Sequence, residues 1–161
     1  MSCDSADDFD VGVQIRKISR TGELMEHLNY PCPVPAKDVA NVNIAKTLGP
    51  QGFLRASHAV SKVDTTTAGV APSETEVTYR HDRREPVKRE TIVKLEITFW
   101  PIGMVFAAGE GIMLRVAGHD QSYPEYESLR LAEPEDVNVG KHTVYTGGGY
   151  DSCLILPRIP S

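Results

Sequence analysis

Two serines stand in sequence contexts that could support nucleophilic catalysis. Ser57 lies in the run RASHA beside His58, and Ser152 lies in the run YDSC. A serine nucleophile of the α/β-hydrolase type needs the turn G-x-S-x-G between a strand and a helix, and neither serine has it. In a strand, Ser57 and His58 point to opposite faces, so they cannot form a nucleophile–base pair with each other. We therefore expect a structural hydroxyl at Ser57 and predict no catalytic residue in this chain.

A neighbouring histidine and aspartate, His119 and Asp120, end a predicted strand, where functional sites often lie. The two side chains could orient each other, but a catalytic triad also needs a nucleophile. We interpret the pair as a strand-end turn in which Asp120 accepts hydrogen bonds from local N–H groups.

The remaining histidines and the glycine-rich run show no metal or phosphate motif. His27, His81 and His142 have no metal-ligand spacing to one another, and the sequence H-E-x-x-H does not occur. Gly147-Gly148-Gly149 lacks the G-K-[ST] and the following helix of a phosphate loop, so we expect a tight corner there. The sequence predicts neither a bound metal nor a cofactor.

The three cysteines are too few and too scattered for a disulfide framework. Cys3, Cys32 and Cys153 have spacing that suits neither zinc nor a redox pair, so we expect reduced thiols, with Cys153 packed as a small apolar side chain. The acidic N-terminus resembles no signal peptide, and no apolar run reaches the roughly 18 residues of a membrane span. These features together predict a cytoplasmic protein.

Aromatic residues offer a possible binding surface. Trp100 with Phe99 and Phe106 could line a groove for a sugar or a peptide, and the pair Tyr123 and Tyr126 is a second candidate. Core or interface packing is the alternative for such side chains. The net charge of −5 argues against a nucleic-acid partner held by phosphate contacts.

The segment Thr91 to Asp120 carries the strongest structural pattern and would position these candidates. Apolar residues alternate with other residues over 93–100 and again over 112–117, on either side of a Pro- and Gly-containing connection. A period of two predicts strands with one buried face. We expect the inward residues of the first run to form much of the core; they are Val93, Leu95, Ile97 and Phe99.

Shorter strands are predicted along the rest of the chain. Phe9 to Arg16 alternates, Ser19 to Gly22 forms a turn, and Glu23 to Tyr30 returns as a hairpin strand. The segment Lys37 to Leu48 is ambiguous, with room for one helical turn. Further strands are expected over Gly52–Val60, Val77–Arg80, Lys141–Thr146 and Ser152–Leu156, the last one buried on both faces.

Seven or eight short strands and no clear helix predict an all-β fold. Pro and Gly corners with long crossing loops favour a jelly-roll β-sandwich. The length of 161 residues predicts a single domain over 1–161, with a long polar surface excursion over about 61–90.

The ordered blocks of this chain resemble one known family over nearly its whole length. The family is the C-terminal, non-catalytic domain of Xaa-Pro dipeptidyl-peptidase and cocaine-esterase-type (CocE/NonD) hydrolases. The blocks that carry the resemblance are Asp7–Val11 with Arg16-Lys17, Gly52–His58, Arg84-Glu85-Pro86, Thr91–Asp120 with Val105-Phe106 and Ala108-Gly109-Glu110, Tyr145–Gly148, and Leu154–Pro157.

The resemblance implies a jelly-roll β-sandwich, similar to galactose-binding domains, that packs against an α/β-hydrolase domain. The Ser, Asp and His of the family's catalytic site lie upstream of every matched block, so none of them transfers to this chain. The family's sandwich also begins earlier than Met1, so we expect the domain to be incomplete at the N-terminus and to lack its first strands. Unpaired sheet edges would then make the isolated chain marginal, prone to associate, or dependent on a partner segment.

Three functional hypotheses follow. In the first, the chain is an accessory domain of a serine hydrolase with Xaa-Pro dipeptidyl-peptidase or acyl-esterase activity; it braces the catalytic domain, and loops 61–90 or 121–138 face the substrate cleft. In the second, it is a stand-alone jelly-roll module that binds a carbohydrate or a protein. The third, an independent enzyme, would need a site that the sequence does not show.

Overall fold

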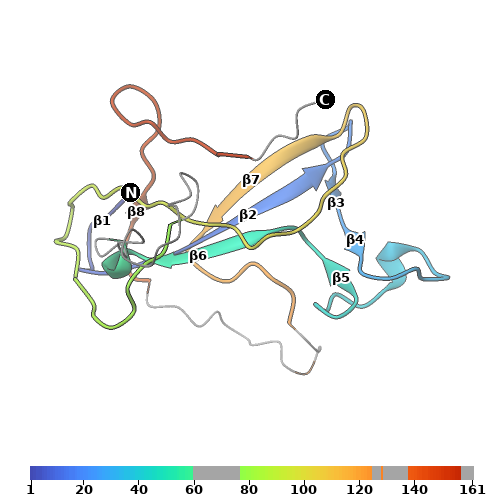
Figure 1. Ribbon diagram of the computed structural model, residues 1–161, viewed down its shortest axis with the longest axis horizontal. Coiled ribbons are helices and arrows are strands. Elements are labelled where there is room, and N and C mark those ends of the chain that lie inside the picture. Colours follow the sequence, from blue (N-terminus) through green and yellow to red (C-terminus); the bar gives the residue numbers. More distant parts are fainter. Residues whose placement is uncertain (60–76, 125–127, 129–137, 157–161) are drawn as a thin grey trace, which may run out of the picture. The chain divides into compact units, whose positions relative to one another are not determined.

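The structure is a computed structural model that describes residues 1–59, 77–124, 128 and 138–156 (Figure 1). Predicted features that fall on the other residues, which include Tyr126 and much of both loops expected to face a cleft, lie outside the described part. Contacts group the chain into two compact units. The first unit comprises Met1–Phe9, Arg55–Glu96 and Asn138–Ser161, and the second comprises Asp10–Leu54 and Ile97–Val137.

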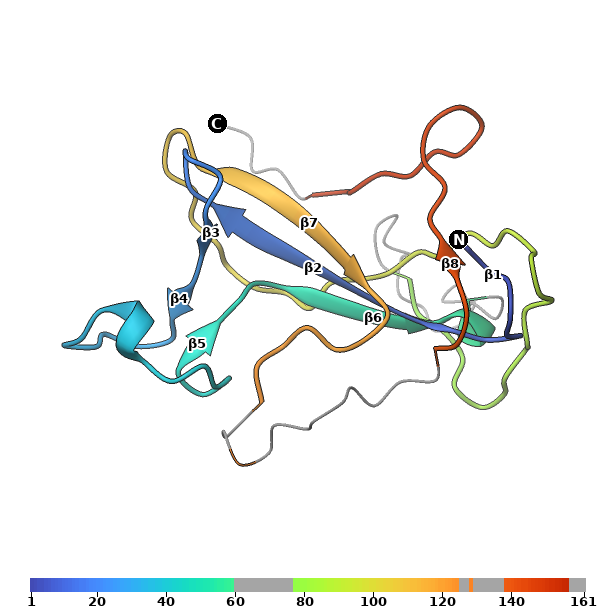
Figure 2. The ribbon, with the colours of Figure 1, turned by 180° about the vertical axis from the view of Figure 1, so that it is seen from behind.

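The centre of the second unit is strand β2 (Asp10–Ile18), which confirms the strand predicted from residue 9 onward. β2 pairs antiparallel with β7 (Gly111–Ala117) in a register that sets Val13 opposite Val116. Strands β3 (Leu24–Met25) and β6 (Gln51–Arg55) complete this four-stranded sheet, in which β2 runs between β6 and β7 (Figures 1 and 2). Val11, Val13 and Ile15 are all less than a tenth exposed, so β2 forms the core of this unit.

The hairpin that follows β2 turns where the sequence predicts. Gly22 donates its N–H to the Ser19 carbonyl at 3.0 Å and has a φ of 84°, a conformation that favours glycine. The returning segment, predicted as one strand, is broken into β3 and β4 (His27–Leu28). Glu26 interrupts it, because its carboxylate accepts hydrogen bonds from Lys46 and Tyr123.

The ambiguous segment before residue 48 contains one helical turn, as the sequence allowed. This turn is the 3-10 helix η1 (Ala36–Asp38), and β5 (Lys46–Thr47) follows and pairs antiparallel with β4. A second 3-10 helix, η2 (Ala56–His58), follows β6. The fold is therefore all-β, as predicted. No helix in the described ranges is long and apolar enough to span a membrane.

The strand predicted over Gly52–Val60 is correct only as far as Arg55. From Ala56 the backbone turns into η2, because Asp8 accepts both the N–H and the hydroxyl of Ser57 and draws the chain out of the extended form. Ser57 and His58 therefore lie in η2, and the prediction that they point to opposite faces of a strand is wrong.

The first run of the Thr91–Asp120 segment is not a strand in the structure. Its described residues are without ladder pairing, although Trp100 donates its N–H to the Gln51 carbonyl at 2.9 Å. Burial alternates only in part: Lys94 and Thr98 are exposed, but Glu96 is half-buried. The four apolar residues predicted to form much of the core, Val93, Leu95, Ile97 and Phe99, are also only half-buried, so that prediction is wrong. A period of two thus marks an extended segment here, but too few backbone groups meet a partner to make a strand.

The second run, β7, is a strand whose predicted inward face is open. Ile112, Leu114 and Val116 are each 44–45% exposed, and β2 is the partner of β7 among the described strands. Their apolar alternation indicates a face that is built for burial, and the described residues leave it half uncovered.

The first unit has shorter strands than the sequence predicts. β1 (Ser2–Cys3) pairs antiparallel with β8 (His142–Thr143), which confirms a strand within the segment predicted from residue 141. The segment Val77–Arg80 has only an isolated bridge position at Tyr79. The predicted final strand over 152–156 is wrong: these residues are non-repetitive, and Ile155 is 66% exposed. Apolar composition there does not reflect burial within the described chain.

Candidate functional site

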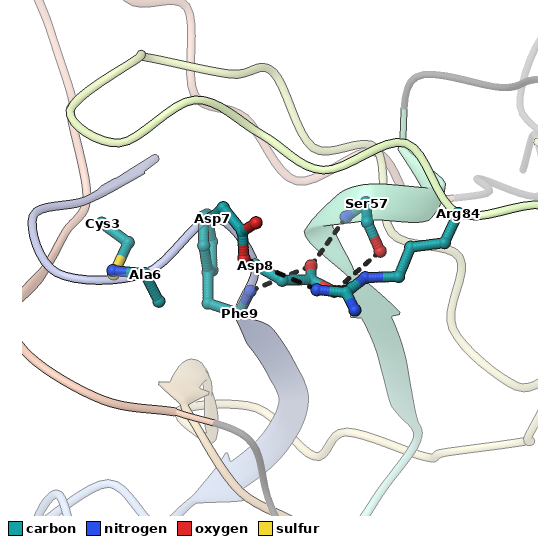
Figure 3. A network of polar contacts seen from close by, with 7 residues as sticks. All are labelled: Cys3, Ala6, Asp7, Asp8, Phe9, Ser57 and Arg84. Atoms are coloured by element: carbon teal, nitrogen blue, oxygen red, sulfur yellow. Dashed lines mark hydrogen bonds and ion pairs between the residues drawn. The ribbon is translucent and has the colours of Figure 1, made fainter.

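The most densely bonded polar cluster of the first unit centres on Asp8. Its side chain is 6% exposed and lies between η2 and the segment that contains Arg84 (Figure 3). Oδ1 accepts the backbone N–H groups of Phe9 at 3.0 Å and of Ser57 at 2.9 Å. Oδ2 accepts the Ser57 hydroxyl at 2.8 Å and the Arg84 Nε–H at 3.0 Å. We call Asp8, Ser57 and Arg84 the Asp8 centre.

Backbone bonds reinforce the Asp8 centre on both sides. Ala56 donates to the Phe9 carbonyl at 2.9 Å, and Val87 donates to the Asp7 carbonyl at 2.7 Å. Glu85 donates to the Ser57 carbonyl at 3.1 Å. Three blocks that carry the family resemblance, far apart in the sequence, therefore meet at one buried carboxylate.

The Asp8 centre is arranged as a clamp. Ser57 is 0% exposed and its hydroxyl is donated to Asp8, so a substrate does not reach its oxygen. The neighbouring His58 does not bond to it; His58 Nδ1 lies 2.9 Å from the Arg80 carbonyl oxygen, and its ring lies against that of His81 at 5.0 Å. A nucleophile needs a base within hydrogen-bond reach and an open approach, and this geometry offers Ser57 neither. That the chain carries no catalytic residue stays a prediction.

Asp120 forms the turn expected of it. Its Oδ1 accepts the N–H of Ser122 at 2.7 Å and the Ser122 hydroxyl at 2.6 Å. The glycine run also behaves as predicted, since Gly147 and Gly148 have φ values of 72° and 60° and Tyr150 donates its N–H to the Gly147 carbonyl. Both features are local turns.

The histidines and cysteines form no metal site within the described residues. His142 stacks on Phe9 with ring centroids 5.2 Å apart, and His27 belongs to the second unit. Within the described ranges, no group of three or more His, Cys, Asp or Glu side chains is placed to hold a metal ion. All three thiols are free; Cys3 is buried, but Cys153 is exposed, so its predicted packing as a small apolar side chain is wrong.

The aromatic candidates among the described residues differ in exposure and in their partners. Trp100 is 69% exposed, and Phe106 lies under Lys17, with Nζ 5.7 Å from the ring centroid. Tyr123 donates its hydroxyl to Glu26 Oε1 at 2.6 Å. This bond and a second one from Lys46 hold the pKa of Glu26 below its ordinary value. Tyr123 is thus occupied within a polar cluster of the second unit.

A cavity of about 470 Å³ opens in the second unit beside the end of β2. Its wall includes Lys17, His27, Asn29 and Thr47 on the polar side. Leu28, Ile102, Met104 and Val105 contribute apolar surface. Such a mixture is typical of sites for small molecules.

Sequence motifs did not predict that Asp8 and Arg84 form a buried polar centre, or that Lys17 and His27 line a cavity. Asp8 and Arg84 were visible only as members of blocks that resemble a family, and 76 residues separate the two. A search for acidic and basic residues inside otherwise apolar or family-matching blocks would have flagged them.

The fold and the Asp8 centre define an all-β domain whose clearest polar site is structural. In line with this, the sequence matches the family described as X-Pro dipeptidyl-peptidase C-terminal non-catalytic domain over residues 1–155. Among solved structures, the chain is similar to the crystal structure of a CocE/NonD family hydrolase from Staphylococcus aureus, with a TM-score of 0.69 and 27% identity. A comparison with curated proteins finds no match.

The chain therefore belongs to the family of X-Pro dipeptidyl-peptidase C-terminal non-catalytic domains. The similarity to the hydrolase covers 94% of this chain but only 25% of the hydrolase. What is matched is thus about a quarter of a much longer protein.

Proposed function

We propose that this chain serves as the accessory C-terminal domain of a serine hydrolase with Xaa-Pro dipeptidyl-peptidase or acyl-esterase activity. In this role it braces an α/β-hydrolase domain and helps to shape the substrate cleft. The observation that carries the proposal is the family match over residues 1–155, almost the whole chain. The burial of Ser57 within the Asp8 centre supports a bracing role, because the one serine beside a histidine is committed to structure.

The proposal requires another domain to supply the nucleophile. The purified chain should give no turnover of a chromogenic Xaa-Pro substrate or of an aryl ester, and the coding sequence upstream of Met1 should contain a G-x-S-x-G domain in frame or as a neighbouring gene. Reproducible turnover by the purified chain, abolished by a serine-directed inhibitor, would contradict the accessory role.

The jelly-roll sandwich is the architecture that we propose for the domain. The open β7 supports it: one edge of β7 pairs with β2, and its apolar side chains remain 44–45% exposed. A sandwich buries such a face under a second sheet. A second sheet, supplied by a partner or by another copy of the chain, would cover this face.

Without a partner that covers this face, the isolated chain should self-associate through β7. Replacing Leu114 by Lys places a charge in the exposed apolar face, and the dissociation constant should rise at least about tenfold, since a buried leucine contributes roughly 1.5–3 kcal/mol. Sedimentation velocity over a concentration series measures the effect. Val139→Lys is the matched control, because Val139 is 57% exposed and lies in the first unit. A wild-type chain that stays monomeric and melts in one sharp transition would argue against an association surface on β7.

The exposed Trp100 favours a second candidate, the stand-alone carbohydrate- or protein-binding module. An indole that is 69% exposed is the type of side chain on which sugars stack. Binding of a sugar or protein ligand by the purified chain, lost in Trp100→Ala, would support this module. Binding of none, together with an in-frame hydrolase domain, would leave the accessory role.

A further inference from the structure

Strand β7 is the outer strand of its sheet, and its free edge carries none of the usual protection. β7 pairs with β2 in a continuous register over 7 residues, and among the described residues no strand pairs with its other edge (Figures 1 and 2). Prolines, bulges and inward-facing charges are among the features that keep a sheet edge from pairing with another chain. β7 contains neither a proline nor a bulge, and its one charged residue, Arg115, is exposed.

The hydrogen bonds of β2 show which backbone groups of β7 face the free edge. Ile15 donates its N–H to the Pro50 carbonyl at 2.9 Å, so its backbone groups point away from β7. Ile15 lies opposite Leu114, and in an antiparallel pair of this kind the backbone groups of both residues point outward. The N–H and C=O of Leu114 therefore point to the free edge. Those of Ile112 and Val116 do the same, because the pattern repeats at every second residue.

The same three residues carry the half-exposed apolar face of β7. Ile112, Leu114 and Val116 are each 44–45% exposed, and no hydrogen bond joins their backbone groups to another described residue. Their side chains share one face, because residues two apart in a strand point the same way. They thus offer a row of backbone donors and acceptors together with a row of apolar side chains, which is what an added β-strand requires.

This edge is complementary to itself when a second copy of the chain approaches in the antiparallel direction. A two-fold axis beside Leu114 places this residue opposite Leu114 of the second copy, and it places Ile112 opposite Val116. In each of these pairs the N–H and C=O groups of both residues are turned toward each other, so the two residues exchange two hydrogen bonds. Apolar side chains also meet apolar side chains at each pair, which stabilises the contact further.

The charges at and beside β7 favour this register over its neighbours. The centred register places Arg115 opposite Met113. A shift by two residues in one direction would place Arg115 directly opposite Arg115 of the second copy, where like charges are destabilising. A shift by two in the other direction would place Glu110, whose carboxylate is paired with Lys17, opposite Val116. A shift by one residue would direct toward the second copy the backbone groups that already bond to β2.

We propose that β7 binds β7 of a second copy of this chain edge to edge, in the antiparallel register that is centred on Leu114. The inference rests on the self-association proposed above and deepens it, because it names the partner and places the contact at the edge of β7. It does not depend on the hydrolase role. The 7 residues of β7 are fewer than the roughly 20–30 that each partner contributes to a stable interface, so the dimer should be weak and concentration-dependent.

Disulfide formation between single-cysteine variants of the full chain tests the register. The Cα atoms of a hydrogen-bonded antiparallel pair lie about 5.5 Å apart, which is within the range of a disulfide. Cys32 and Cys153, the two thiols that are not buried, are first replaced by Ser. In this background we expect Leu114→Cys to cross-link with itself. Ile112→Cys and Val116→Cys should cross-link when they are mixed, and neither should do so alone.

Arg115→Cys and Met113→Cys are the matched controls for the register. Each of them would cross-link with itself in one of the two shifted registers, so both should stay largely monomeric under oxidation. Faster self cross-linking of either control than of Leu114→Cys would overturn the proposed register. If none of the five variants cross-links above the level of the Cys32→Ser/Cys153→Ser background, the edge-to-edge dimer is wrong.

A proline variant separates edge pairing from contact between apolar faces. Val116→Pro keeps an apolar side chain and removes an N–H that faces the free edge, so the ladder with β2 should persist. The dimer would lose one hydrogen bond from each copy, and its dissociation constant should rise about tenfold. Val139→Pro, at an exposed valine of the first unit, should leave it unchanged. Unchanged association in Val116→Pro, with association lost in Leu114→Lys, would indicate stacked faces and would overturn the edge contact.

These outcomes are independent of those that test the accessory role. A chain that forms no cross-link, but has an in-frame hydrolase domain upstream, would remove the dimer and leave the accessory role. Turnover by the purified chain would remove the accessory role and leave the dimer, because the edge contact uses backbone groups and apolar side chains only.

Discussion

Replacing Asp8 by Ala should lower the free energy of unfolding by about 3 kcal/mol. The change removes four hydrogen bonds and leaves the Ser57 hydroxyl and two backbone N–H groups buried without an acceptor. Removal of one partner of a fully buried ion pair costs roughly 3–5 kcal/mol, and we take the lower end because Arg84 is 55% exposed and keeps part of its hydration. Thermal unfolding should move down by about 6–12 °C.

Asp7 provides the matched control for Asp8. It is the adjacent residue of the same type, but its side chain is 63% exposed and lies 3.6 Å from Arg84. Asp7→Ala should therefore change stability by less than about 1 kcal/mol. The double variant Asp8→Ala/Ser57→Ala should be less destabilised than the sum of its parts, because Ser57→Ala removes the orphaned hydroxyl. Equal effects at positions 7 and 8 would show that the Asp8 centre is not the clamp inferred from its geometry.

Replacing Gly49 by Ala should destabilise the chain by at least about 3 kcal/mol. A Cβ at Gly49 would lie 2.0 Å from the Ile15 carbonyl oxygen, and the backbone φ of 129° is one that side chains rarely adopt. Overpacking costs about 1–3 kcal/mol and a disfavoured backbone conformation costs a similar amount. The close approach arises because the next residue, Pro50, accepts the N–H of Ile15 at 2.9 Å. Chemical denaturation monitored by circular dichroism measures the difference.

Gly22 separates the backbone effect from the steric one. Its φ is 84°, but a Cβ there would meet no atom within 4 Å. Gly22→Ala should cost only about 1–2 kcal/mol, the usual cost of a positive φ for alanine. If Gly49→Ala were no worse than Gly22→Ala, then the contact with Ile15 would contribute nothing.

The sequence predicted those elements whose signal is local and periodic. Apolar residues recur at every second position in β2 and β7, and the turn after β2 contains Gly22, the residue that its positive φ requires, so all three elements are where the pattern predicts them. The same alternation over 93–100 misled, because it reports which side chains face inward and not whether a neighbouring backbone supplies hydrogen bonds. The apolar run that ends at Leu156 was wrongly predicted as a buried strand for a related reason. Its apolar composition does not show whether other residues cover it, and within the described chain Ile155 and Leu156 are exposed.

Long-range side-chain bonds explain what the sequence could not predict. Asp8 meets Ser57 across 49 positions and Arg84 across 76, and no period or spacing links such residues. The end of β6 at Arg55 follows from these bonds, so it was equally hidden. The cavity beside His27 depends on the backbone at Gly49, whose conformation is decided by its approach to β2.

The buried side chain of Lys46 can be used to detect local unfolding of the second unit. The side chain is 1% exposed, and its ammonium group donates to Glu26 at 2.9 Å and to Asn41 at 2.8 Å. Trypsin and amine-reactive esters need access to the lysine side chain, so they should spare Lys46 while this unit is folded and attack Lys94, which is 80% exposed, from the start. Cleavage or acylation at residue 46 would then record each local opening of the unit, without any added label.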